Sequence, residues 1–315
     1  MYATRGTDWG QVGLVLRGAH LGWCLAVIAV SIGCHVLRAE RWRVLLRPVG
    51  DVPRWPTIAA TFIGFGANAL LPLRLGEIVR PAFLARRVGI PLSATISSIV
   101  LERIFDTLLV IGCLLAVGLV YEVPPLLRQG AIVLGAVAGS GLVVLVLMAR
   151  NRATAERLIR RVLDVLPPRI GGALWSIADG LLHGLGGLAD LRIVVVVLVS
   201  SVLLWGLITL TYTLSFLALD VPIPLLAGSL VTVVIVAASV FLPQAPGFIG
   251  TWQAGCVFAL NVVFGVPHDI AVGYSLLTWV IQMVANVGSA LVGVALEGVS
   301  WRELVSEQRG EVQEG

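Results

Sequence analysis

Uninterrupted apolar runs constrain the fold of this chain more than any other feature of its sequence. The runs at 193–219 and 270–296 contain no charged residue, and each exceeds the roughly 20 helical residues that cross a hydrocarbon core about 30 Å thick. Charged residues make up 13% of the chain, whereas soluble domains have roughly 25%. These features exclude a soluble enzyme, a secreted disulfide scaffold and a disordered regulator. They predict an all-α, polytopic transmembrane helix bundle.

The apolar runs predict about six full spans within a single integral membrane domain, residues 1–315. Arginines cluster between Arg38 and Arg54, directly after the first run, and we interpret this cluster as a cytoplasmic loop because such loops are rich in basic residues. This assignment places the amino terminus outside. The predicted full spans are residues 21–37, 92–121, 130–148, 193–219, 225–242 and 270–296.

The connections between spans differ in charge. Residues 122–129 carry one Arg and are predicted to be external, and a polar tail follows Leu296. The stretch 150–190 is rich in Arg and has apolar residues at helical spacing. We predict that it is a cytoplasmic amphipathic segment on the membrane surface, with its arginines facing lipid phosphates. An ordinary solvated linker is the alternative.

Two short apolar segments are interrupted by proline and glycine in the same pattern. The first contains Pro72 and Gly76, and the second contains Pro246, Gly247 and Gly250, so both read Pro-x-x-x-Gly. We predict two re-entrant or broken helical segments, one entering from the cytoplasm and the other from outside. This arrangement indicates an inverted repeat with halves 56–149 and 193–296, joined by the segment 150–190. A chance match of two residues in each copy is the alternative.

Charged residues surround the first broken segment and continue into the next span. Each would cost roughly 2.5–3.5 kcal/mol alone at the centre of a membrane helix, so we expect pairing or a hydrated cavity. Glu102 and Asp106 share a helix face, and Glu77 and Arg80 are close enough in sequence to pair. One hypothesis is an anion receptor, because guanidinium binds phosphate through two parallel hydrogen bonds. Its predicted substrate-binding residues are Arg74, Arg80, Arg103 and Asn68, and its supporting charges are Glu77, Glu102 and Asp106. The alternative is a structural ion-pair lock at the cytoplasmic boundary.

The remaining polar residues give weaker signals. Gln253, Gln282 and Asn286 are candidates for the same cavity, although hydrogen bonding between helices is the alternative role. The four histidines are scattered and the four cysteines lie in apolar runs. We therefore expect no metal site, no cofactor and no nucleic-acid partner.

Four stretches carry a specific combination of motifs: Arg41-Trp-Arg, residues 68–80 (NALLPLRLGEIVR), residues 100–106 (VLERIFD) and residues 242–250 (LPQAPGFIG). Together they resemble the lysylphosphatidylglycerol synthase transmembrane-region family, also called the flippase-like domain family. The resemblance runs from about Arg38 to Leu296. It implies movement of a lipid, or of a lipid-linked headgroup or sugar, between leaflets, and we expect a multi-pass protein of the bacterial cytoplasmic (inner) membrane.

The chain departs from the pattern of that family in several places. The first transmembrane helix usual in the family is expected to be missing. Gln253 stands where the family often has Glu, and Tyr274-Ser275 stands where it often has Tyr-Arg. We therefore expect the charges that contact substrate to lie in the amino-terminal repeat. Only a short tail follows Leu296, so synthase activity is not expected.

The leading functional hypothesis is a membrane lipid translocator, not an enzyme, acting on an anionic headgroup or a lipid-linked sugar. A secondary transporter of a small soluble anion would use the same charges in a water-filled pathway. A non-transporting membrane scaffold for a lipid-modifying enzyme is the third hypothesis. Membrane lipids are the expected partners, with a second copy of the chain or a lipid-synthesis enzyme as further candidates.

Overall fold

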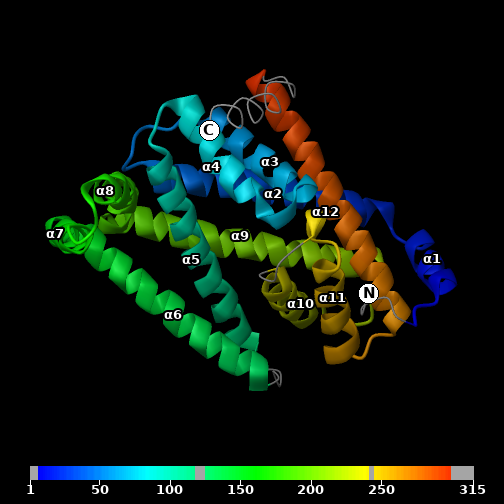
Figure 1. Cartoon of the computed structure of the whole chain (residues 1–315). Coiled ribbons are helices and arrows are strands. Elements are labelled where there is room, and N and C mark those ends of the chain that lie inside the picture. The colour runs from blue at the N-terminus through cyan, green and yellow to red at the C-terminus, as the bar shows by residue number, and fades with distance from the viewer. Residues whose placement is uncertain (1–5, 118–124, 241–244, 299–315) are drawn as a thin grey trace.

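A computed structural model of the whole chain describes residues 6–117, 125–240 and 245–298 (Figure 1). The described residues form helices and short connections, with no strand among them. The all-α prediction is therefore confirmed for this part of the chain. The helices are α1 (Trp9–Arg17), α2 (Leu21–Leu46), α3 (Arg54–Leu70), α4 (Gly76–Val88), α5 (Leu92–Val117), α6 (Pro125–Arg150), α7 (Arg152–Leu163), α8 (Pro168–Gly184), α9 (Leu191–Ala218), α10 (Leu225–Val240), α11 (Thr251–Val257) and α12 (His268–Glu297).

Three of the described helices, α2, α9 and α12, are long and apolar enough to cross a membrane. A fourth span results if the bent pair α6–α7 is counted as one, although its two parts, Gly135–Arg150 and Arg152–Leu163, meet at 106°. The expected six full spans are not confirmed. Two of the six predicted spans belong to α5 and α10, which are helical but are not among the candidate spans. Helix α5 is long enough but contains Glu102, Arg103 and Asp106, and α10 is too short.

The three long helices alternate in direction. The backbone N–H of His20, just before α2, donates to the carbonyl of Ala218 at the end of α9, at 2.9 Å. Thr7 and His268 are joined by a hydrogen bond of 3.2 Å, which brings the start of α12 to the same end of the molecule. The helices α2 and α12 therefore run opposite to α9, in agreement with the directions expected from the charge pattern. In Figure 1, α2 and α9 run across the view beside each other.

Helix α2 corrects the prediction of a cytoplasmic loop after residue 37. The helix continues to Leu46 and buries Arg38 and Arg41. The signal for this lay in the sequence, because Cys34, Arg38, Arg41 and Leu45 follow one face of a helix, and all four are buried. An arginine cluster after an apolar run therefore does not mark the end of this helix.

Both predicted breaks are present as tight turns with the same backbone geometry. The turn η2 (Pro72–Arg74) joins α3 to α4, and the turn η4 (Pro246–Phe248) precedes α11. In each turn the two residues after proline have positive φ: 56° and 55° at Leu73 and Arg74, and 64° and 62° at Gly247 and Phe248. Helix α11 continues into a π-helical turn, η5 (Phe258–Val263). The two turns contact each other, so the breaks meet although they are far apart in the sequence.

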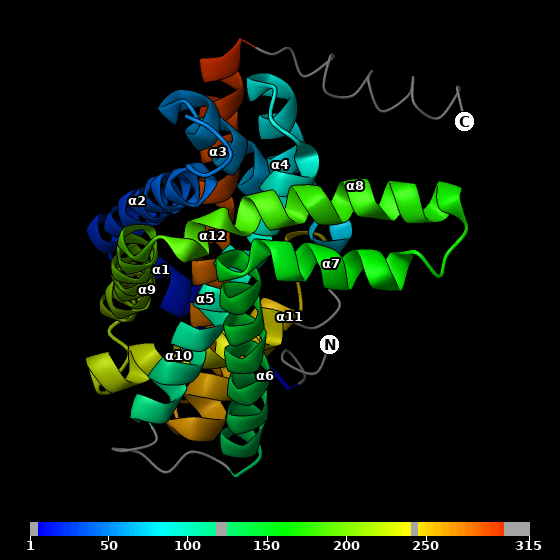
Figure 2. The ribbon, with the colours of Figure 1, turned by 90° about the vertical axis from the view of Figure 1, so that its left-hand side faces the viewer.

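The segment 150–190 forms a helical hairpin that projects from the rest of the molecule. Figure 2 shows α7 and α8 side by side, extending away from the other helices, and the short turn η3 (Leu185–Ala189) leads from α8 to α9. In Figure 1 both helices are seen end-on, whereas α2 and α9 lie across the view. The cytoplasmic placement of the segment 150–190 remains a prediction. Residues 122–124 of the predicted external loop and the tail after residue 298 lie outside the described residues. Residues 125–129 correct the loop prediction, because they form the start of α6.

Candidate functional site

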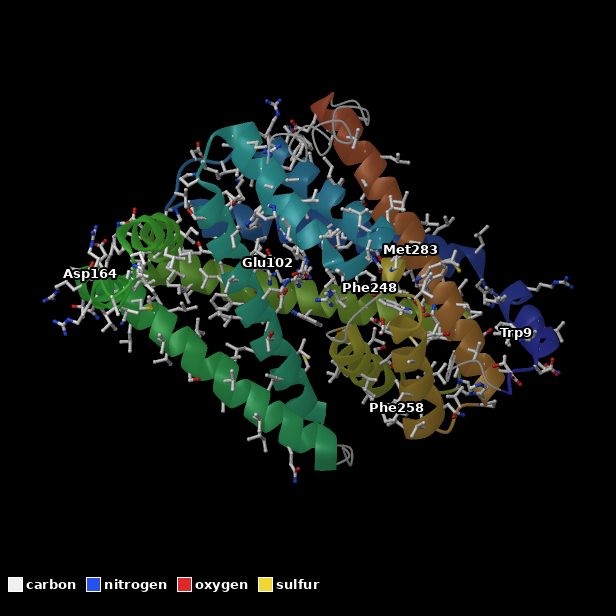
Figure 3. All side chains as sticks on the ribbon, in the orientation of Figure 1. Trp9, Glu102, Asp164, Phe248, Phe258 and Met283 are labelled. Atoms are coloured by element: carbon white, nitrogen blue, oxygen red, sulfur yellow. The ribbon has the colours of Figure 1, made fainter. Side chains whose placement is uncertain are left out.

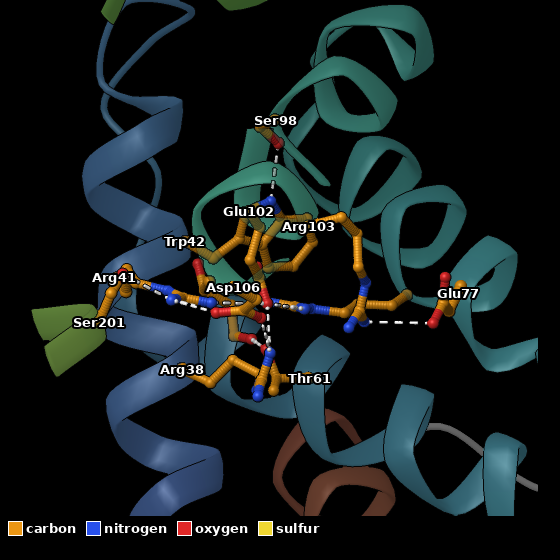
Figure 4. A network of polar contacts seen from close by, with 12 residues as sticks. Arg38, Arg41, Trp42, Thr61, Glu77, Ser98, Glu102, Arg103, Asp106 and Ser201 are labelled. Atoms are coloured by element: carbon orange, nitrogen blue, oxygen red, sulfur yellow. Dashed lines mark hydrogen bonds and ion pairs between the residues drawn. The ribbon is translucent and has the colours of Figure 1, made fainter. Parts of the chain in front are cut away.

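A group of buried charges lies where α2, α4, α5 and α9 approach one another. We call Arg38, Arg41, Arg80, Glu102 and Asp106 the inner charge group. Figure 3 places Glu102 near the middle of the molecule, and Figure 4 shows the contacts around it. Glu102 is completely buried, and the other members of the group are between 1% and 8% exposed. Charges at this depth persist only when each has a partner of opposite sign.

Each carboxylate of the inner charge group receives several donors. The guanidinium of Arg38 donates to Glu102 Oε1 at 2.9 Å and to Asp106 Oδ2 at 2.8 Å. Arg41 Nη1 donates to Asp106 Oδ1 at 2.7 Å and to the Ser201 hydroxyl of α9 at 2.7 Å. The spacing of four residues puts both carboxylates on one face of α5, as the sequence predicted, and the structure directs this face toward α2.

Arg80 reaches the same centre from α4. Its Nη1 lies 3.2 Å from Glu102 Oε1, and its guanidinium carbon lies 4.1 Å from the ring centre of Trp42. The Trp42 indole N–H in turn donates to Ser98 at 2.8 Å. The expected local pair of Glu77 with Arg80 is wrong, because Arg80 turns inward while Glu77 turns toward Arg74 and Arg103.

A second, more accessible charge group lies beside the first. We call Arg74, Glu77 and Arg103 the cavity charge group. Glu77 Oε1 lies 3.2 Å from Arg103 Nη2 and 3.5 Å from Arg74 Nη1. The side chains of these three residues are 24–36% exposed. Arg74 also lies over the ring of Phe248, with 5.9 Å between the guanidinium carbon and the ring centre, so the first broken segment touches the second through this pair.

The cavity charge group borders a cavity of about 260 Å³. Every charged residue among the described lining residues comes from the first half of the chain: Arg38, Arg74, Glu77, Arg103 and Asp106. The three tryptophans of the wall, Trp205, Trp252 and Trp279, all come from the second half. The first half of the chain therefore contributes the charged groups of the cavity wall, and the second half contributes its tryptophans.

Two glycines allow the elements that carry these charges to approach closely. A Cβ on Gly76 would lie 2.0 Å from the carbonyl oxygen of Gly64 and 2.6 Å from Asn68 Oδ1. A Cβ on Gly64 would lie 2.7 Å from Arg80 Cβ. Only glycine fits these positions, so the α3–α4 hairpin is tight enough to direct Arg80 inward and Glu77 toward the cavity.

The predicted site residues divide between the cavity and its surroundings. Asn68, Gln282 and Asn286 line the cavity, and Gln282 Nε2 donates to Asn286 Oδ1 at 3.0 Å. Gln253 does not line it, because its side chain accepts from the backbone N–H of Gly250 at 2.7 Å and caps α11. Arg80 and Glu102 are likewise behind the wall. Residues Pro72, Gly76, Pro246, Gly247 and Gly250 shape the turns rather than the cavity lining.

Sequence reasoning did not identify Arg38 and Arg41 as candidate site residues, nor the three tryptophans of the cavity wall. The arginines follow a long apolar run and therefore resemble a loop, although their helical spacing continues the buried face of α2. The tryptophans lie on separate helices in the second half of the chain, and nothing in their spacing brings them together. Their convergence depends on the packing of α9, α11 and α12.

Comparison with known proteins identifies the family. The family described as the lysylphosphatidylglycerol synthase TM region matches residues 1–293, and the chain belongs to it. A protein named glycosyltransferase AglD, from Haloferax volcanii, is 24% identical over 90% of this chain, which spans 51% of the length of that protein. No solved structure matches the chain. Family membership and the apolar helices together identify a multi-pass membrane protein related to membrane lipids.

Proposed function

We propose that this member of the lysylphosphatidylglycerol synthase TM region family is a lipid translocator that receives an anionic headgroup in its cavity. The observation that carries the proposal is a charge imbalance. Among the described residues, five guanidinium groups of the inner and cavity charge groups are paired with three carboxylates, which leaves a formal charge of +2. A net positive charge within a membrane is costly, so an anion that enters the cavity is stabilised there.

The position of the excess positive charge, at the cavity wall, supports a lipid headgroup as the anion. Arg74 and Arg103 border the cavity and share the single carboxylate of Glu77. Because the two arginines share one carboxylate, one of them can donate to a phosphate while the other remains paired with Glu77. Guanidinium suits this role because its forked donors match phosphate oxygens. The remainder of the wall is mainly apolar and aromatic, with a few neutral polar groups, and this composition suits a lipid better than a fully hydrated ion.

The packing of the broken segments supports an inverted repeat, with halves 56–149 and 193–296. Helix α3 precedes the first break and packs against α12, the long helix that follows the second break. Helix α10 precedes the second break and packs against α5, the long helix that follows the first. This reciprocal exchange is the arrangement expected of two related halves that meet at a site. We propose that rocking of one half against the other exposes the cavity alternately to each leaflet.

We further propose that the chain moves lipid rather than modifying it, and that it does so in the bacterial cytoplasmic membrane. Glu77 and Asp106 are the carboxylates of the described cavity wall, and each is held by two arginines. A carboxylate held in this way is a poor general base, because its charge is already stabilised. The name of the Haloferax relative denotes glycosyl transfer by that protein, of which this chain spans about half the length.

The test is lipid exchange in liposomes that contain the purified protein. A fluorescent phosphatidylglycerol is placed in both leaflets, and a membrane-impermeant quencher reports the fraction that reaches the outer leaflet. Wild-type protein is expected to make the whole lipid pool accessible. Arg103→Ala is expected to slow exchange about tenfold or more, because a charge-assisted hydrogen bond contributes about 1.5–3 kcal/mol. Arg152→Ala, on α7 and away from the cavity, is the matched control.

The alternative functions give different results in the same system. Uptake of radiolabelled inorganic phosphate without lipid exchange would identify a transporter of a soluble anion. Absence of both activities, together with stable association with a lipid-modifying enzyme, would identify a scaffold. Equal lipid exchange by wild type and Arg103→Ala would overturn the proposed site.

A further inference from the structure

We infer that the headgroup received by the cavity is a phosphate joined to a neutral, hydroxylated sugar ring. The inference rests on the proposed function and narrows its substrate class. It follows from the division of the wall into guanidinium groups from the first half of the chain and tryptophans from the second half. A ligand that contacts both needs an anionic part and an uncharged part with a flat, C–H-rich face.

The tryptophans offer ring surface rather than hydrogen bonds. The indole N–H of Trp252 donates to Thr278 at 3.2 Å, and that of Trp279 donates to the carbonyl of Gly247 at 2.6 Å. The indole N–H of Trp205 donates to Asp106 Oδ1 at 3.2 Å. These bonds fix the three rings and occupy their polar edges. Their remaining surface is aromatic carbon with a negative π face, which attracts the slightly positive C–H groups of a sugar ring.

Neutral polar groups border the same space. Ser31 Oγ and Asn68 Oδ1 are buried and have no hydrogen-bond partner among the described residues, and both residues line the cavity. Gln282 and Asn286 lie in the wall and are bonded to each other. Hydroxyl groups both donate and accept, so a polyhydroxylated ring satisfies serine and amide groups together.

The charge balance decides against a cationic group beside the phosphate. Aromatic walls also bind ammonium groups through cation–π contacts, so a choline or aminoacyl headgroup is the competing ligand. The described charges of the site already sum to +2, and its carboxylates are held by arginines. A further cation would be repelled, whereas a neutral sugar leaves the attraction for phosphate intact.

The experiment compares four lipids with identical dioleoyl tails, mixed in equal amounts with the full-length protein in detergent and observed by native mass spectrometry. Phosphatidylglucose carries phosphate and sugar, and phosphatidic acid methyl ester carries phosphate alone with the same charge. Glucosyl-diacylglycerol carries sugar alone, and phosphatidylcholine carries phosphate with an ammonium group. Phosphatidylglucose is expected to bind about tenfold more tightly than each of the others.

Two variants test whether the preference for phosphatidylglucose depends on the cavity wall. Trp252→Leu is expected to reduce the advantage of phosphatidylglucose over the methyl ester to about threefold or less, because the aromatic surface is lost. Trp23→Leu, on α2 and not among the cavity-lining residues, is the matched control and should keep the preference. Both variants are first checked for an unchanged thermal midpoint, and Trp279→Leu, in the same cavity wall, replaces Trp252→Leu if the latter unfolds.

The outcomes separate this inference from the proposed function. Equal binding of phosphatidylglucose and the methyl ester, with lipid exchange intact, would overturn the sugar and retain the anionic headgroup. Preferential binding of phosphatidylcholine would replace the sugar with an ammonium group. Failure of all phosphate-bearing lipids to bind would instead overturn the proposed function.

Discussion

The inner and cavity charge groups use the same residue types in two different environments. In the inner charge group, Glu102 and its arginine partners are 10% exposed or less and hold α2, α4 and α5 together. In the cavity charge group, the side chains of Arg74, Glu77 and Arg103 are 24–36% exposed and border an open space. Glu102, Arg41 and Arg80 lie behind the cavity wall, so their ion pairs support the fold. Arg38 and Asp106 line the cavity but are at most 10% exposed and hold each other. The more exposed pairs of the cavity charge group can exchange partners, so we assign substrate binding to that group.

The largest expected effect on stability comes from removing the charge of Glu102. Glu102→Gln leaves Arg38, Arg41 and Arg80 around a neutral amide, and breaking a buried ion pair in this way costs about 3–5 kcal/mol. The free energy of unfolding in detergent, measured by denaturant titration, should fall by this amount. Glu77→Gln in the cavity charge group is the matched control and should lose less than about 1 kcal/mol. Similar losses for the two variants would show that burial does not separate the groups.

An intermediate effect on stability is expected at Gly76, because this glycine positions residues of both charge groups. Gly76→Ala places a methyl group against the Gly64 carbonyl and Asn68, so α4 must move together with Glu77 and Arg80. Overpacking of this kind costs about 1–3 kcal/mol. The variant should therefore show a lower thermal midpoint and also slower lipid exchange. Gly33→Ala, on α2 with open space around its Cβ position, is the control, and an effect confined to stability would show that α4 does not set the cavity geometry.

The smallest effect on stability is expected at Arg103. Arg103→Ala removes a partly exposed ion pair, which contributes about 0–1 kcal/mol, so its free energy of unfolding should stay within about 1 kcal/mol of wild type. Its lipid exchange is nevertheless expected to fall, as described above. Arg152→Ala removes the comparably exposed pairs with Glu156 and Asp179 and should change neither quantity appreciably. A stability loss at Arg103 as large as that of Glu102→Gln would make it part of the structural core.

The local pattern of the sequence predicted most of the secondary structure. The apolar runs place α5, α9, α10 and α12 to within a few residues, because a helix that enters a membrane must be apolar along its length. The two Pro-x-x-x-Gly segments located both turns, since proline cannot continue a preceding helix. Helical spacing also predicted that Glu102 and Asp106 share one face of α5, and in the structure both carboxylates accept from Arg38.

Which charges face the cavity was decided by tertiary structure. Arg74, Arg80 and Arg103 are equivalent in the sequence as basic residues near a break, yet Arg80 packs on Trp42 behind the wall while the other two border the cavity. The difference depends on the close approach of α3 and α4 and on the continuation of α2 through Arg38 and Arg41. Side-chain direction in a packed bundle is set by contacts between segments far apart in the chain, and the local pattern of residues carries no record of those contacts.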